Sequence, residues 1–182
     1  MQIFLDTEFT GLNQNTTLIS IAMFIDDNNY FYAELNDFDK SQIFSWLTEN
    51  VISKLEFYDK ISFFNQVGNS VKMKSDSSEV KEILSNWLKQ YDVVEIWADV
   101  LAYDWVLFCN LFGGALNLPK NVFYIPFDLS TLFRTKGFIN PKNNYEKDID
   151  RFQFVGVANS NQHNALIDTI VEKKCYEKLM SL

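Results

Sequence analysis

The chain has 182 residues, the length of one compact domain that can bury a sizeable core without disulfide or metal staples. Hydrophobic residues make up 47% of it and aromatic residues 16%, which excludes a disordered or low-complexity chain. The formal net charge of -8 argues against a broad basic face for nucleic acid, because such binding gains most of its affinity by neutralising phosphates. Composition alone therefore predicts one folded domain over residues 1–182 and points away from polynucleotides.

Cysteine usage and hydropathy favour a reducing, intracellular compartment. Cys109 and Cys175 lie in segments that have the pattern of buried helix faces, and they lack the spacing of a redox or zinc site. No run approaches the roughly 20 apolar residues of a membrane-spanning helix, and the N-terminus shows no signal-peptide pattern. We therefore expect a soluble, cytoplasmic protein with no membrane partner.

The first half of the chain predicts a strand meander followed by helices. Residues 2–6, 17–25 and 30–35 have the pattern of strands joined by short turns. Apolar residues then recur at three- and four-residue steps over 39–58, which predicts one or two helices. Residues 65–78 are polar, and we interpret them as a loop.

The second half alternates helices and strands. Three strands followed by such an alternation predict an α/β fold with a mixed sheet of about five strands, the first three antiparallel, and helices on both faces. The segment 137–162 is interpreted as a long loop, and loops of that length are usually functional or mobile. The predicted elements are helices over 78–91, 101–112, 128–136 and 164–180 and strands over 93–98 and 122–127.

Two carboxylates follow one another at the end of the first predicted strand. Asp6 and Glu8 are two residues apart, so both side chains lie on one face of the strand while Thr7 points to the other. Neighbouring carboxylates raise each other's pKa unless a cation lies between them, so the pair suits Mg²⁺ or Mn²⁺. A solvated strand end is the alternative for this pair taken alone.

Two further acids lie on apolar helical stripes. Asp104 shares its stripe with Leu107 and Leu111, and Asp168 shares one with Val171. A carboxylate on a helix face that packs against a sheet needs a partner, although an acid that serves the first-turn amides is the alternative for Asp104. Both residues therefore join the candidate metal ligands.

The single histidine precedes the last predicted helix. His163 and Asp168 are five residues apart, about 140° around a helix, so both face one site only if the histidine lies before the helix begins. A neutral imidazole there suits a base that deprotonates water. An exposed loop histidine is the alternative for this residue taken alone.

Three segments together resemble a known family. The runs 6-DTEFTGL-12, 102-AYDWVLF-108 and 163-HNALID-168 resemble the three motifs of the DEDDh superfamily of 3′→5′ exonucleases, which have the ribonuclease H-like fold. Within it the chain is most similar to small stand-alone bacterial and phage exoribonucleases related to a mycobacterial RNA exonuclease. The likeness covers nearly the whole chain, although residues 37–91 carry no motif.

The resemblance implies a metal-dependent reaction. It implies two divalent ions, Mg²⁺ or Mn²⁺, with His163 as the general base, and release of nucleoside 5′-monophosphates from single-stranded 3′ ends, RNA favoured. The family and the surplus of aromatic residues also favour a homodimer. Many relatives have Gly-His-Asn where this chain has residues 99–103, which makes Asp99 a minor rival to Asp104. The metal-binding acids implied are Asp6, Glu8, Asp104 and Asp168.

Substrate contacts are expected beside the motifs. Phe9, where many relatives have Thr, and Leu12 are candidates for stacking on the terminal base, with backbone amides near Thr7 for its 3′-hydroxyl. Tyr103 and Trp105 are weaker candidates because both have the alternative of packing between helix and sheet, and core packing is also the alternative for Phe9.

A basic stretch precedes His163, and we interpret it as a lip for the incoming strand, with an ordinary solvated loop as the alternative. Its basic residues are Arg134, Lys136, Lys142, Lys147 and Arg151.

Other functions remain open. A DNA-directed proofreading or repair exonuclease would share the metal site, and a catalytically inactive nucleic-acid-binding module would share the fold. Retention of all five polar groups counts against the inactive module, and the lack of an EF-hand loop counts against a Ca²⁺-binding protein. Two divalent ions would offset four carboxylates, so the acidity of the chain is partly a metal-binding feature.

Overall fold

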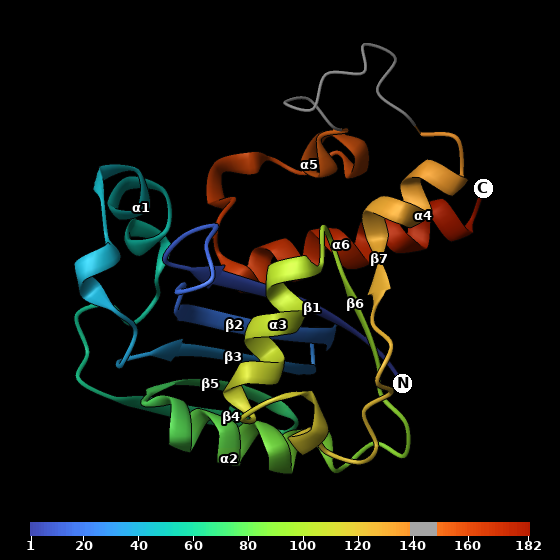
Figure 1. Ribbon diagram of the computed structural model, residues 1–182. Helices are drawn as coiled ribbons and strands as arrows, with labels where there is room; N and C mark the ends of the chain where they lie inside the picture. Colours follow the sequence, from blue (N-terminus) through green and yellow to red (C-terminus); the bar gives the residue numbers. More distant parts are fainter. Residues whose placement is uncertain (139–148) are drawn as a thin grey trace.

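The computed structural model describes residues 1–138 and 149–182. Within these residues the centre of the protein is a seven-stranded mixed sheet in the order β4-β5-β3-β2-β1-β6-β7 (Figure 1). The strands are β1 Gln2–Phe9, β2 Leu18–Asp26, β3 Asn29–Leu35, β4 Phe63–Val67, β5 Ser70–Ser75, β6 Glu95–Ala98 and β7 Phe127–Asp128. The helices are α1 Ser45–Asn50, α2 Ser77–Leu88, α3 Ala102–Leu111, α4 Leu129–Thr135, α5 Arg151–Val155 and α6 Ala165–Met180.

The predicted mixed α/β class is confirmed. Strands β1, β2 and β3 pair antiparallel, whereas β6 runs parallel to β1 and β7 parallel to β6. The sheet has two strands more than the five expected, because β4 and β5 extend it beyond β3.

The two extra strands lie within residues 63–75, most of which belong to the segment 65–78 that was wrongly interpreted as a loop. Strand β4 is an edge strand and its last four residues are exposed, so its sequence shows no alternation of apolar and polar residues. In β5, Val71 and Met73 enter the core. Gly68, with φ of 59°, makes the tight turn between the two strands.

The strand expected over 122–127 was also wrong in extent. Val122 forms an isolated bridge with Val94, and only Phe127 and Asp128 pair with β6. Pro126 lies between these two contacts and has no N–H to donate to a ladder, so the chain cannot pair continuously.

The irregular regions contain short helices. The stretch 39–58 forms α1 flanked by 3₁₀ turns at Lys40–Gln42 and Ile52–Lys54. The described part of the segment 137–162, which was interpreted as a loop, contains α5 and a 3₁₀ turn at Asn159–Asn161. The other helices begin and end within a few residues of the predicted bounds.

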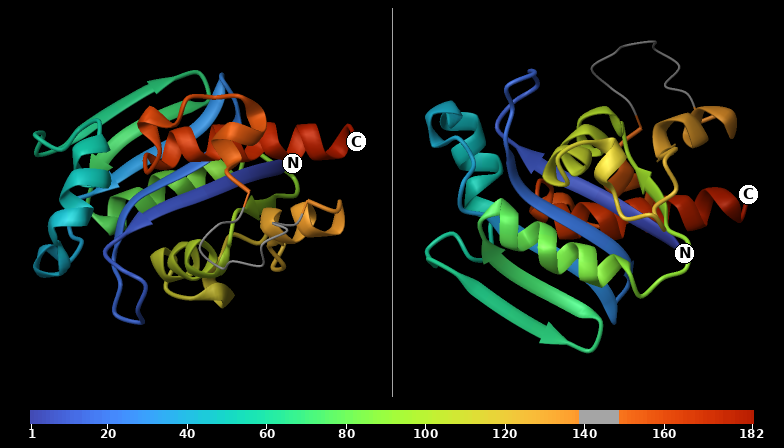
Figure 2. Two further views of the ribbon diagram at one scale, coloured as in Figure 1. Left: turned by 90° about the horizontal axis from the view of Figure 1, so that it is seen from above. Right: turned by 60° about the horizontal axis from the view of Figure 1, so that its bottom comes forward.

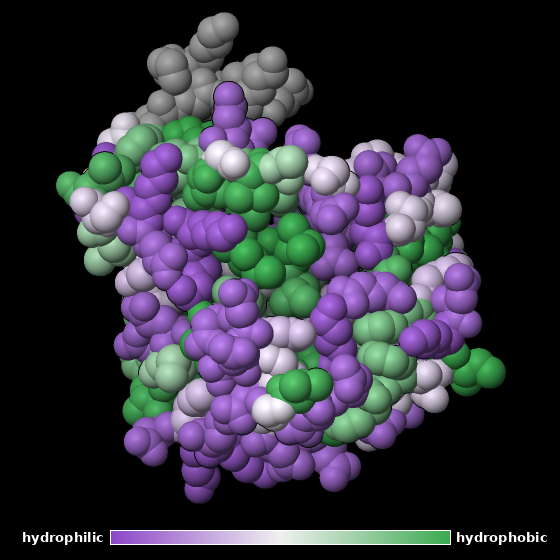
Figure 3. Space-filling view, turned by 180° about the vertical axis from the view of Figure 1, so that it is seen from behind, coloured by the Kyte–Doolittle hydropathy of each residue, from purple (hydrophilic) through white to green (hydrophobic). Residues whose placement is uncertain are grey.

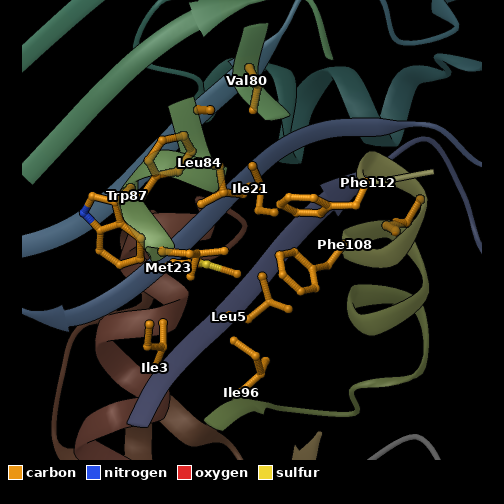
Figure 4. Packing of buried hydrophobic residues seen from close by; sticks show 14 of the residues in the cluster. Ile3, Leu5, Ile21, Met23, Val80, Leu84, Trp87, Ile96, Phe108 and Phe112 are labelled. Atoms are coloured by element: carbon orange, nitrogen blue, oxygen red, sulfur yellow. The ribbon is translucent and has the colours of Figure 1, made fainter. Parts of the chain in front are cut away.

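Helices cover both faces of the sheet. Helices α2 and α3 pack on one face, where Leu84 of α2 and Phe108 of α3 share one hydrophobic cluster with Leu5 of β1 and Ile21 of β2 (Figure 4). Helix α6 crosses the opposite face, as the view from above shows (Figure 2), and its Ala165 packs with residues of β2 and β3. Strand β1 therefore lies between α3 and α6.

Helix α6 also supports the C-terminal part of the fold. Phe133 of α4 and Phe152 of α5 pack with Val171, Cys175 and other residues of α6. Hydrophobic side chains gather on the surface over α5 and the beginning of α6, as the view from behind shows (Figure 3). None of the helices in the described ranges is long and apolar enough to cross a membrane.

Candidate active site

Strand β1 and helix α6 bring three carboxylates together. Asp6 and Glu8 lie opposite Ala22 and Ser20 of β2, on the sheet face that α6 covers. Asp168 lies in the first turn of α6. One oxygen atom from each of the three side chains lies within 4.8 Å of the others. The predicted cluster of Asp6, Glu8 and Asp168 is therefore brought together by the fold.

Asp104 reaches the same strand end from the opposite face. Its Oδ1 accepts hydrogen bonds from the backbone N of Thr7 at 3.0 Å and from Thr7 Oγ1 at 2.6 Å. Thr7 points away from Asp6 and Glu8, as the period of a strand requires. The candidate substrate contact of Thr7 is thus occupied by Asp104, which lies in the first turn of α3.

The electrostatics of the cluster favour a cation. Burial raises the pKa of Asp104 to about 6 and that of Asp168 to about 7. The pKa values of Asp6 and Glu8 are raised well above their ordinary range by burial first and by neighbouring carboxylates second. The Oδ2 atom of Asp6 is buried and has no hydrogen-bond donor among the described residues. A set of oxygen ligands with an unsatisfied buried oxygen fits a hard divalent cation.

His163 lies directly before α6, as predicted. The helix begins at Ala165, and Asn164 caps it by accepting a hydrogen bond from the backbone N of Ile167 at 3.2 Å. The backbone N of His163 donates to Asp168 Oδ2 at 2.8 Å. Burial, and next the charge of Lys54, lower the pKa of the imidazole. The ring is therefore neutral at pH 7 and able to accept a proton.

His163 has a left-handed backbone, with φ of 68°, and its ring lies edge-on to Trp46, with centroids 5.2 Å apart. Trp46 and Phe44 are half-exposed side chains whose rings stack at 6.5 Å. They line the cleft of about 1160 Å³ that also contains the four acids and His163. The apolar spacing over 39–58 predicted helices here but no role in the site, because an exposed aromatic pair on a six-residue helix carries no motif of its own.

The candidate substrate residues separate into two groups. Phe9 and Tyr103 stack on each other with ring centroids 5.2 Å apart, and both line the cleft. Leu12 lines it too, with 78% of its surface exposed. Trp105 instead packs against Phe108 at 5.8 Å and does not line the described cleft.

One acid of the cleft was missed by the sequence analysis. Glu172 is buried one helical turn after Asp168 and lines the same cleft. Its Oε1 accepts a hydrogen bond from the backbone N of Asp99 at 3.1 Å. The available signal was the four-residue spacing from Asp168, which places both side chains on one helix face.

Asp99, the alternative to Asp104 as a metal ligand, forms a salt bridge with Arg151. Arg151 donates from Nε to Asp99 Oδ2 at 2.8 Å and from Nη2 to Oδ1 at 3.1 Å, and Ser130 Oγ also donates to Oδ1 at 2.7 Å. Arg151 was expected in the basic lip, but its ion pair holds it at Asp99, directly after the end of β6. Arg134 and Lys136 are exposed at the end of α4, whereas Lys142 and Lys147 lie outside the described residues.

Carboxylates gathered at the end of the first strand of a mixed α/β sheet, beside a neutral histidine, fit the class of metal-dependent hydrolases that act on phosphate esters. The chain belongs to the Rv2179c-like family, because the model of the 3′-5′ exoribonuclease Rv2179c-like domain matches residues 1–180. It is similar to the 3′-5′ exoribonuclease Rv2179c of Mycobacterium tuberculosis, with 29% identity over 139 residues, 75% of this chain and 76% of the relative. The 3′-5′ exoribonuclease MT2234.1 of another strain of that organism matches with the same identity and coverage. The prediction of a 3′→5′ exonuclease is confirmed.

Proposed function

We propose that the protein is a metal-dependent 3′→5′ exoribonuclease that releases nucleoside 5′-monophosphates from single-stranded 3′ ends. The observation that carries this proposal is the carboxylate cluster of Asp6, Glu8 and Asp168, which has raised pKa values and an unsatisfied buried oxygen. The names of the two relatives support RNA as the substrate.

Two divalent ions fit the charge of the site. Asp6, Glu8 and Asp168 would hold them directly, with Asp104 contributing from the other face of β1. When bound, such ions lower the pKa of an attacking water and stabilise negative charge on phosphate oxygens. Four carboxylates carry four negative charges and two divalent ions carry four positive ones, so the loaded site is neutral before phosphate enters.

His163 acts as the general base in this proposal. Its lowered pKa keeps the imidazole neutral, so it can take the proton of a water that attacks the scissile phosphate. The backbone N of His163 holds Asp168 Oδ2, which fixes the distance between the base and the carboxylate cluster. The ring contact with Trp46 restricts the imidazole further.

The terminal nucleotide would be held by rings and apolar side chains that line the cleft. Phe9 and Leu12, which follow the acids in the sequence, line the cleft together with Phe44 and Trp46. Stacking on an aromatic ring is worth about 1–3 kcal/mol per base and tolerates any base. This architecture suits an extended single strand and does not need a basic face.

The proposal is tested with matched single-stranded RNA and DNA, each labelled at the 5′ or the 3′ end, in Mg²⁺, Mn²⁺ or EDTA. A 5′ label on RNA should give a ladder that shortens from the 3′ end, and EDTA should stop it. A 3′ label should appear at once as a mononucleotide. Faster shortening of DNA would indicate a repair enzyme, and no metal-dependent shortening of either strand would indicate an inactive binding module.

A further inference from the structure

Glu172 is a buried acid that lines the cleft, has no role in the proposed reaction and has no cationic partner among the described residues. Asp150 lines the cleft too, but it serves as the cap of α5 by accepting a hydrogen bond from the backbone N of Gln153. The side chain of Glu172 is only 4% exposed, although it lies beside the carboxylate cluster. A carboxylate so deeply buried is costly unless something donates to it. Its presence therefore calls for a partner.

The contacts of Glu172 satisfy one of its two oxygens. Oε1 takes the hydrogen bond from the backbone N of Asp99, whereas Oε2 is buried with no donor in the described residues. The nearby guanidinium of Arg151 is paired with the carboxylate of Asp99. The charges that act on Glu172 from Asp99, Asp104 and Asp168 are all negative.

A hydrated cation would satisfy Oε2. Glu172 is not one of the three residues whose oxygens converge within 4.8 Å, so it lies outside the direct ligand set. Mg²⁺ takes six oxygen ligands and usually keeps several waters, each of which must donate its protons. Carboxylates that accept from such waters orient them and raise the affinity for the metal.

We infer that Glu172 is a positioning residue of the metal site, whose Oε2 accepts a hydrogen bond from a water that hydrates the bound cation. This inference rests on the proposed function. Glu172 would then link the carboxylate cluster to the end of β6, because its Oε1 accepts a hydrogen bond from the backbone N of Asp99.

The alternative is that Glu172 only ties α6 to the end of β6. That role needs one acceptor oxygen and no charge, so a glutamine would fill it. Glu172→Gln keeps an acceptor for Asp99 N but places an amide group where Oε2 lies. The two roles therefore predict different metal affinities for this variant.

Glu34 offers a matched control. It is also buried, and its Oε2 has no hydrogen-bond partner within residues 1–138 and 149–182. Its Oε1 accepts from Tyr32 OH and from the backbone N of Phe57, both at 2.9 Å. It lies on β3 and does not line the cleft. Glu34→Gln thus removes the same buried charge away from the metal ligands.

The experiment is calorimetric titration of the metal-free full chain with Mn²⁺, without substrate. We expect Glu172→Gln to weaken Mn²⁺ binding by about tenfold or more, as loss of a residue that orients a metal's ligands typically does, and Glu34→Gln to bind like the wild type. Thermal unfolding in EDTA and in excess Mn²⁺ gives a second readout, since weaker binding means a smaller rise in Tm on adding the metal.

Equal Mn²⁺ affinity in Glu172→Gln and the wild type would overturn the inference and leave the proposed function standing. A wild type that binds no Mn²⁺ would overturn both. If Glu172→Gln does not fold, Glu172→Asp replaces it, because the shorter side chain keeps the charge but withdraws Oε2. The same loss of affinity is expected from it, and unchanged affinity would again overturn the inference.

Discussion

The carboxylates on the two faces of β1 differ in the hydrogen-bond donors that they receive from the protein. On the α3 face, the carboxylate of Asp104 accepts two hydrogen bonds from Thr7, one from the backbone and one from the hydroxyl. On the α6 face, Asp6, Glu8 and Asp168 converge, and Asp6 Oδ2 has no donor among the described residues. Oδ1 of Asp104 therefore has donors within the protein, whereas the cluster on the α6 face contains a buried oxygen without one, which fits a cation.

This difference indicates that one face of β1 serves to attach a helix and that the other is suited to metal binding. The hydrogen bonds of Asp104 connect α3 to the strand whether or not metal is present. On the α6 face, burial and the neighbouring carboxylates raise the pKa values of Asp6 and Glu8, and the divalent ion that we propose there would replace the bound protons. Metal affinity and stability would then be linked at this face.

The largest effect is expected from the α6 face. Asp6→Asn should abolish the release of mononucleotides, because it removes a central ligand. In EDTA the same variant should unfold at a higher temperature than the wild type, since a buried carboxylate without a donor has been neutralised. Nuclease assays and thermal unfolding measure the two effects. Asp27→Asn, at the exposed β2–β3 turn, is the control, and retained activity in Asp6→Asn would refute the assignment.

The second largest effect is expected from replacing His163, the proposed general base. His163→Asn should lower kcat by about 10²-fold to 10⁴-fold, because asparagine tolerates the left-handed backbone but cannot take a proton at pH 7. Its backbone N still donates to Asp168, so Mn²⁺ affinity should stay that of the wild type. Steady-state kinetics and calorimetry separate the two. Wild-type kcat in this variant would exclude His163 as the base.

The pH dependence of stability distinguishes the loaded site from the empty one. Without metal, Asp104 and Asp168 bind protons more tightly in the folded state, with pKa values of about 6 and about 7, than in the unfolded chain. Their contribution to the free energy of unfolding is therefore greatest below pH 4 or so and is lost as pH rises through these values. Excess Mg²⁺ should remove this decline, because the ion replaces the protons.

Thermal unfolding from pH 5 to pH 8, in EDTA and in Mg²⁺, measures this contrast. The difference in Tm between the two conditions should widen as pH rises. Parallel profiles would show that the carboxylates do not exchange protons for metal.

The smallest effect is expected on the α3 face. Thr7→Val removes the hydroxyl that donates to Asp104 and keeps the backbone donor, so it should cost about 1–3 kcal/mol of unfolding free energy. Activity should fall less than tenfold, because the α6 face is untouched. Urea unfolding measures the cost, and Thr7→Ser, which retains the hydroxyl, should lose much less. An equal loss in both variants would contradict the role of the hydrogen bond.

Much of the site could be predicted because local periodicity determines it. The two-residue repeat places Asp6 and Glu8 on one face, and the helical repeat places Asp168 toward the sheet. The position of His163 followed from its angle to Asp168 around the helix axis. These inferences need only the geometry of one element at a time.

Other features depend on contacts between elements. The edge strand β4 has no buried face of its own, so its sequence resembles a loop. The pairing of Arg151 with Asp99 joins residues 52 positions apart, and nothing in the local charge pattern indicates it. Trp46 reaches His163 from a region without a motif. Tertiary packing decides such contacts, and a single sequence does not show it.

We propose above that the carboxylates on the α6 face of β1 bind the divalent ion. Crystals soaked in Mn²⁺ and measured for anomalous scattering test it directly. We expect an anomalous peak among the oxygens of Asp6, Glu8 and Asp168. A map with no peak at these three side chains, at a Mn²⁺ concentration that supports activity, would contradict it.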